Sequence, residues 1–132
     1  MKKYIKTSVF LTACMILAGC SASAEKEKHL ALLADSRAGM LSAELPLESG
    51  PLSIMRATAK GSTIELMIVY NQDAKGAKPI AEVFKGSVQS YCTSKDTKNN
   101  LEAGLSYRIK MRNTRGQLLI DELITQKSCE KS

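Results

Sequence analysis

The residues with the clearest chemical meaning are Leu17-Ala18-Gly19-Cys20, which close an uncharged apolar run and precede a polar segment. A basic start made by Lys2, Lys3 and Lys6 comes before that run. A basic start, a short apolar stretch and small residues at a cut are the layout of a signal peptide. The tetrapeptide has the form of a lipobox, where signal peptidase II cleaves between Gly19 and Cys20. We therefore predict a lipoprotein signal peptide at residues 1–19 and acylation of Cys20; the alternative is a buried N-terminal helix.

The apolar run is too short to cross a membrane, since a spanning helix needs about 20 apolar residues. A single acyl chain binds a membrane only marginally, at about 0.8 kcal/mol per buried CH₂. Bacterial lipoproteins carry two or three chains, such as palmitate, and this makes attachment lasting. Ser21 follows the cysteine, where Asp would retain a lipoprotein in the inner membrane. We expect residues 20–28 to form a lipidated tether at the periplasmic face of the outer membrane.

The charge of the chain argues against nucleic-acid binding. It has 19 Lys and Arg residues against 13 Asp and Glu residues, a formal net charge of +6. Removal of residues 1–19 takes away three lysines and lowers this charge to +3. The remaining basic residues are interspersed with acidic ones, which is typical of a solvated surface, and no basic stripe alternates with aromatic residues. The 113 residues left are enough for one domain with a modest core, predicted at residues 29–132.

The four cysteines divide into two groups. Cys14 leaves with the signal peptide and Cys20 takes the lipid, so Cys92 and Cys129 remain. An even pair in an oxidising compartment predicts a disulfide, although two unrelated thiols are the alternative. A structural zinc site needs four ligands, and the chain has one histidine, so no metal is expected.

No catalytic constellation is visible in the sequence. A Ser or Cys nucleophile needs a base, and the single histidine, His29, lies beside the predicted tether. Asp121 and Glu122 are adjacent, so on a strand their side chains point to opposite faces. No phosphate-binding or dinucleotide-binding glycine motif is present. We therefore expect neither an enzyme nor a cofactor.

Hydrophobic periodicity predicts helices at residues 25–44 and 79–92, the second opened by Pro79. Residues 52–59 and 62–70 predict two strands around a glycine turn. Residues 93–100 are predicted to be turn-like, and residues 101–104 a short strand or a turn. Residues 105–112 form a clean amphipathic strand, and Asn113-Thr114-Arg115-Gly116 is a hairpin signal leading to a strand at 117–125. The tail, residues 126–132, is polar.

The order of these elements predicts an α+β fold. Strands joined by tight turns are antiparallel, so we expect an antiparallel sheet of four to five strands. An N-terminal helix and a second helix between two hairpins would cover one face. The apolar stripe of the second helix fits core packing, with a partner groove as the alternative, and Gly86 in its middle costs about 1 kcal/mol relative to Ala.

The whole chain resembles the AspS (YghG, GspS-beta) type of pilotin lipoprotein of type II secretion systems. The resemblance rests on motifs in order: the lipobox ending at Cys20, Leu45-Pro46-Leu47-Glu48-Ser49-Gly50, Tyr91-Cys92, Gly104-Leu105-Ser106-Tyr107, Asn113-Thr114-Arg115-Gly116 and Cys129. It implies an α/β sheet domain with a disulfide and no enzymatic activity. It also implies that the chain binds the C-terminal segment of a secretin subunit. The lipoprotein-sorting machinery would then carry both to the outer membrane for channel assembly.

Three surfaces are candidates for partner binding, and no partner-binding residue is assigned. They are a groove beside the second helix, which we prefer, the sheet face with Met67 and Val69, and the sheet edge. A partner would enter as a short helix or strand. A lipoprotein inhibitor or shield acting on an external hydrolase is the competing function, because small size, a disulfide and a lipid anchor fit that role too.

Overall fold

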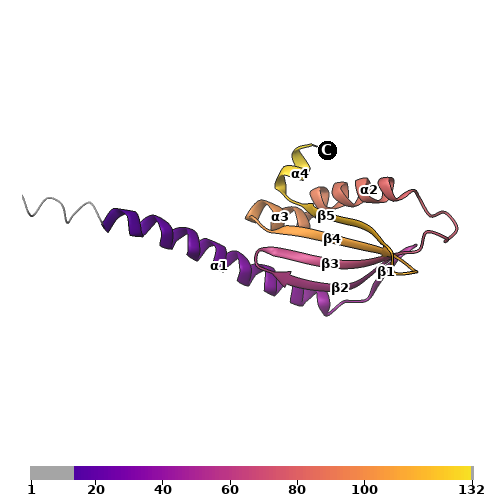
Figure 1. Cartoon of the computed structure of the whole chain (residues 1–132), viewed down its shortest axis with the longest axis horizontal. Helices are drawn as coiled ribbons and strands as arrows, with labels where there is room; N and C mark the ends of the chain where they lie inside the picture. The colour runs from indigo at the N-terminus through magenta and orange to yellow at the C-terminus, as the bar shows by residue number, and fades with distance from the viewer. Residues whose placement is uncertain (1–13, 132) are drawn as a thin grey trace, which may run out of the picture.

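The structure is a computed structural model that describes residues 14–131, with the backbone alone described for residues 14–21. Its elements are α1 (Cys14–Ser42), β1 (Leu47–Ser49), β2 (Leu52–Lys60), β3 (Thr63–Tyr70), α2 (Ile80–Thr93), α3 (Lys95–Ala103), β4 (Ser106–Asn113), β5 (Leu118–Ile124) and α4 (Gln126–Glu130). The predicted signal peptide lies mostly outside the described residues. Figure 1 shows the first half of α1 projecting from a domain built on one sheet.

The five strands lie in the order β1-β2-β3-β4-β5, which confirms the α+β class. The sheet is mixed rather than wholly antiparallel, because β3 and β4 pair in parallel along their full length. The other three pairs are antiparallel. Parallel neighbours need a long crossover, and α2 and α3 supply it here. The prediction of two separate hairpins was right, but the pairing between them was wrong.

The core lies on one face of the sheet. Alternate residues of β3 and β4 point into it, and every second residue of β3 is buried. The helices pack against that face, and their half-buried or buried side chains join a single apolar cluster. The opposite face carries ion pairs, among them Arg108 with Asp121 at 2.8 Å. A two-residue period thus separates an apolar face from a charged one.

Two helices differ from the sequence-based expectation. α1 begins at Cys14 rather than at residue 25, and it ends at Ser42, ahead of Pro46. α3 occupies a segment predicted to be turn-like, and residues 101–103 are its last turn rather than a strand. The sequence signal for this helix is at its C-terminal end. Gly104 has φ 110°, the left-handed conformation that commonly ends helices. The polar composition of residues 95–100 hid the helix because only one side of it is buried.

Two short elements were not predicted. β1 is a three-residue edge strand that pairs with β2. α4 lies in the polar tail, where Thr125 accepts a bond from the Ser128 amide and its own amide donates to the Ser128 hydroxyl at 3.0 Å. This reciprocal cap satisfies amides that the first helical turn leaves free. The remaining strands and α2 agree with prediction to within a residue or two.

Candidate functional site

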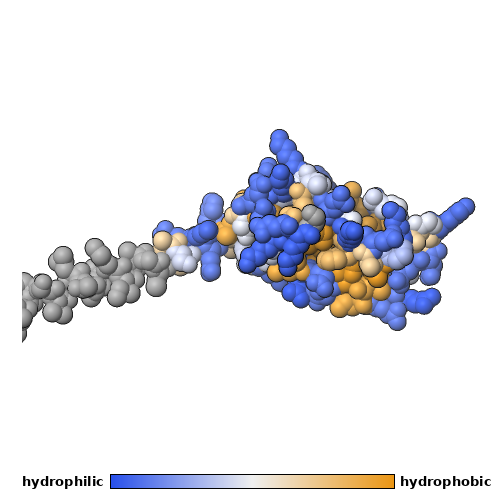
Figure 2. Space-filling model, turned by 90° about the horizontal axis from the view of Figure 1, so that it is seen from above, coloured by the Kyte–Doolittle hydropathy of each residue, from blue (hydrophilic) through white to orange (hydrophobic). Residues whose placement is uncertain are grey.

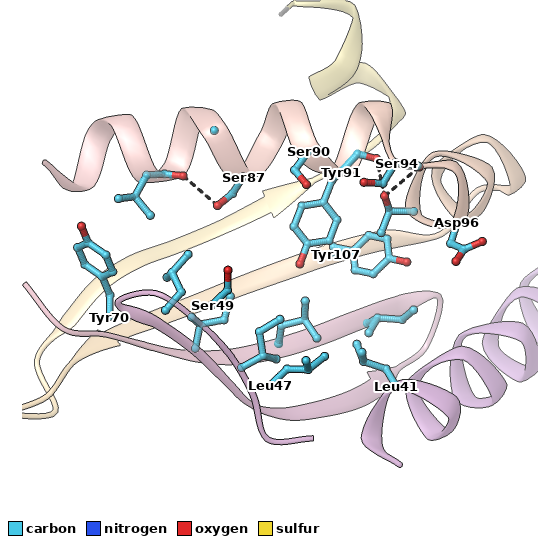
Figure 3. A pocket seen from close by; sticks show the side chains of 18 of the residues that line it. Leu41, Leu47, Ser49, Tyr70, Ser87, Ser90, Tyr91, Ser94, Asp96 and Tyr107 are labelled. Atoms are coloured by element: carbon cyan, nitrogen blue, oxygen red, sulfur yellow. Dashed lines mark hydrogen bonds between the residues drawn. The ribbon is translucent and has the colours of Figure 1, made fainter. Parts of the chain in front are cut away.

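A groove of about 940 Å³ runs beside α2. The sheet forms its floor, α2 and the start of α3 form one wall, and β1 with the last turns of α1 form the other (Figure 3). Of the three surfaces considered from the sequence, this is the preferred one. The groove lies between the two helices because α1 packs against β2 and β3, while α2 packs toward β5 and the short helices α3 and α4.

The floor of the groove is apolar. It is made by residues that the strand alternation turns toward the helices: Leu52, Ile54, Ile64, Leu66, Ile68 and Tyr70. The β3 members are buried, whereas those of β2 are half-buried at the side of the core. Burial of such surface by a partner is favourable by about 25 cal/mol per Å². The floor therefore favours an apolar occupant.

The α2 wall is lined by small residues. No side chain of α2 is fully buried, and the residues it turns to the groove include Gly86, Ser87 and Ser90. The Ser87 hydroxyl is already used, since it donates to the Val83 carbonyl at 2.9 Å. A Cβ placed on Gly86 would meet nothing within 4 Å. Packing within the chain therefore does not require this glycine, and the space beside it belongs to the groove.

The opposite wall exposes apolar side chains at its rim. Met40 on α1 is 59 % exposed and Leu47 on β1 is 42 % exposed. Both line the groove. Large apolar side chains placed around a concavity are the usual mark of a binding site for another molecule. In the space-filling view, a continuous apolar area also interrupts the hydrophilic surface of the domain (Figure 2).

Tyrosines fix the two ends of the groove. At one end the Tyr70 hydroxyl donates to the Lys78 carbonyl at 2.6 Å and ties the loop before α2 to the sheet. At the other, the rings of Tyr91 and Tyr107 lie 4.9 Å apart with a 45° tilt. The Asn100 amide donates to the Tyr107 hydroxyl at 2.7 Å. Burial raises the pKa of both Tyr91 and Tyr107, so these groups stay neutral and act by packing and hydrogen bonding.

The predicted disulfide between Cys92 and Cys129 is present, with a Cα–Cα distance of 5.5 Å. It joins the last turn of α2 to α4. The side chains of α2 that pack against the core are half-buried, so the bond adds a covalent restraint to this wall of the groove. The sequence predicted the pairing, but it did not reveal that the bond lies at one end of the helix that forms a groove wall.

The other predicted site lies away from the groove. Cys20 and Gly19 belong to the projecting part of α1, and their side chains are outside the described set. Among the described residues, no helix is both long enough and apolar enough to span a membrane.

In the same part of the chain, no three His, Cys, Asp or Glu residues come together to hold a metal. Met67 and Val69 are half-buried on the far face of the sheet.

The fold and the groove define a small α+β domain with an open, apolar groove between two helices. The chain belongs to the family of type II secretion system pilotin S proteins, whose family model matches residues 26–129. This confirms the resemblance stated above. Pilotins are accessory proteins of secretion rather than enzymes.

Three relatives illustrate the match. The solved structure of the type II secretion system pilotin AspS from Vibrio cholerae is 61 % identical, covers 82 % of this chain and 99 % of that chain, and superposes with a TM-score of 0.78. The pilotin EpsS from the Vibrio vulnificus type 2 secretion system is 52 % identical over 80 % of this chain and 96 % of that chain, with a TM-score of 0.76. Pilotin AspS 2 from Escherichia coli O78:H11 is 24 % identical over 108 residues, 82 % of this chain and 77 % of that protein.

Proposed function

We propose that this secretion pilotin binds the C-terminal segment of a type II secretin subunit in the groove beside α2 and escorts it to the outer membrane. The observation that carries the proposal is the apolar groove itself, open between α1 and α2 on a domain of the pilotin family. No specific observation favours the competing function, an inhibitor or shield for an external hydrolase.

The geometry of the groove favours a helical occupant. The backbone of β2 and β3 is already paired within the sheet, so the floor offers side chains and few free peptide groups. A buried segment must satisfy its own amides and carbonyls, and a helix does this internally. The free edge of β1 is three residues long and gives little support to an added strand.

The anchor completes the proposal. We propose that signal peptidase II cuts before Cys20, that this cysteine is acylated, and that Ser21 permits sorting to the outer membrane. Two or more acyl chains hold a protein on a membrane for long times. The secretin would therefore travel with its escort. A Cys20→Ser variant is expected to leave the secretin in the inner membrane, which fractionation measures; normal arrival of the secretin would contradict the escort.

Groove binding is tested with substitutions of exposed apolar residues, which leave the core intact. Met40→Asp and Leu47→Asp place a carboxylate at the rim and should weaken binding of the secretin segment at least tenfold by calorimetry. Leu118→Asp and Leu123→Asp are matched controls, since these leucines are 49 % and 46 % exposed outside the groove. Equal binding by all four variants would exclude the groove as the docking site.

A further inference from the structure

The charges around the groove have the opposite sign to the chain as a whole. Four acidic residues line it, against two basic ones: Glu44, Glu48, Glu82 and Asp96, with Arg37 and Lys78. The whole chain has 19 basic and 13 acidic residues. The acidic character of this rim is therefore a local property and does not follow from composition.

The four carboxylates are also available to a partner. All four are exposed, and within residues 22–131 none of them forms an ion pair. The far face of the sheet differs, because its acidic residues are paired within the chain. Glu65 lies 3.2 Å from the Lys60 ammonium and 3.3 Å from that of Lys110. The carboxylates on the far face are thus neutralised by lysines and arginine of the same chain, whereas those at the groove rim are not.

The acidic residues stand on both sides of the apolar floor. Glu82 and Asp96 belong to the wall made by α2 and α3, while Glu44 and Glu48 belong to the wall made by α1 and β1. An occupant seated on the floor would meet carboxylates along each flank. Anionic flanks on the occupant would be repelled, and cationic flanks would be attracted.

We propose that the groove selects a cationic amphipathic helix, with an apolar stripe facing the sheet and Lys or Arg on both flanks. The inference rests on the proposed function and defines the chemistry of the segment that the groove accepts. Exposed ion pairs are individually weak, and each contributes about twofold to fivefold in affinity. Their collective effect is to reject acidic amphipathic helices and to speed the encounter with basic ones.

The test uses the full chain in detergent and two crosslinked helical peptides of 14 residues, the length of α2. The peptides share one apolar stripe and carry either Lys or Glu on both flanks. The Lys peptide is expected to bind at least tenfold more tightly at about 0.05 M salt, and the difference should shrink at about 0.5 M salt, where screening is strong.

A matched pair of variants locates the effect. Glu48→Gln with Glu82→Gln neutralises one carboxylate on each wall and should weaken the Lys peptide by about fivefold or more. Glu102→Gln with Glu130→Gln removes the same charge from exposed positions outside the groove and should change nothing. Both double variants keep the fold, since no substituted side chain is buried.

The outcomes separate this inference from the function on which it rests. Equal binding of the two peptides, tighter binding of the Glu peptide, or no binding of either one overturns the charge selection. The C-terminal segment of the secretin from the same genome is the third probe. Its tight but salt-independent binding would retain the function and overturn the inference, whereas its failure to bind the wild-type chain would remove the function itself.

Discussion

Gly86 illustrates how one residue links stability to binding. It lies within α2, where glycine costs about 1 kcal/mol relative to Ala. The space beside it is open and belongs to the groove. The chain thus keeps a destabilising residue at a place where its own packing does not require one. Under the proposed function, close approach of the secretin segment to the α2 backbone would account for it.

Gly86→Ala is therefore expected to have opposite effects on folding and binding. The free energy of unfolding should rise by about 1 kcal/mol, measured by urea denaturation, because the helix gains a better helix former. Affinity for the secretin segment should fall, because a methyl group enters the groove. Gly104→Ala is the contrasting variant: φ is 110° and a Cβ would lie 3.2 Å from the Leu30 Cδ1, so it should destabilise the domain.

Glu65 gives the far face of the sheet a pH dependence. Partial burial raises its pKa, but the ion pairs with Lys60 and Lys110 outweigh this and hold the pKa below the ordinary value of 4.5. A lowered folded-state pKa stabilises the native state above that ordinary value, and the contribution is lost as pH falls through the folded-state pKa.

Glu65→Gln should accordingly be less stable than wild type at neutral pH, by about 1 kcal/mol or less for pairs at the surface. The difference should shrink as the pH falls below 4.5. Denaturation midpoints at several pH values measure it, with Glu102→Gln as the unpaired control. A difference that does not depend on pH would show that the ion pairs contribute nothing.

At the level of elements, α2 is the wall of the groove that combines half-buried packing with a covalent bond. The sheet and α1 contribute the fully buried apolar side chains of the N-terminal half, whereas α2 contributes none. The Cys92–Cys129 bond ties its last turn to α4.

Cys129→Ser, or reduction of wild type, is expected to lower stability by about 2–4 kcal/mol. It should also weaken binding of the secretin segment, because the released helix end no longer holds the groove wall. Amide hydrogen exchange should show the loss of protection concentrated in α2 rather than in β3 and β4. Uniform loss of protection would mean that the bond supports the whole domain and not the wall.

Sequence patterns predicted the elements whose own periodicity is strong. The alternation of Ile64, Leu66 and Ile68 defined β3 and its buried face, and the same holds for β4. The parallel pairing of those strands could not be predicted from either strand alone, because it depends on where α2 and α3 carry the chain. α3 was missed because its residues are mostly polar, although Gly104 marked its end.

The sequence predicted a groove beside α2, but it did not predict which residues line that groove. Its floor uses side chains that any core strand would supply. Its walls arise because α1 and α2 pack against different strands. No local sequence pattern determines how far apart the two helices lie. No sequence pattern placed the exposed Met40 and Leu47 at the rim of a groove, where the structure has them.

At the scale of the molecule, α1 is a single helix that leaves the domain. Residues 22–29 are exposed, and packing begins at Leu30. Ala24→Pro should interrupt the exposed part, because Pro in a helix interior costs about 3 kcal/mol. Circular dichroism of the chain should report less helix, while the thermal midpoint stays unchanged. Ala24→Ser is the control, and a lowered midpoint would mean that this segment supports the domain.

The same helix contributes to the groove through Arg37, Met40 and Leu41. From Cys20 to Leu41 it rises about 30 Å. With Cys20 acylated as proposed, whatever occupies the groove would be held at a set height above the lipid headgroups and in a set orientation. A segment bound there would therefore reach the bilayer in one orientation, which a flexible linker would not impose.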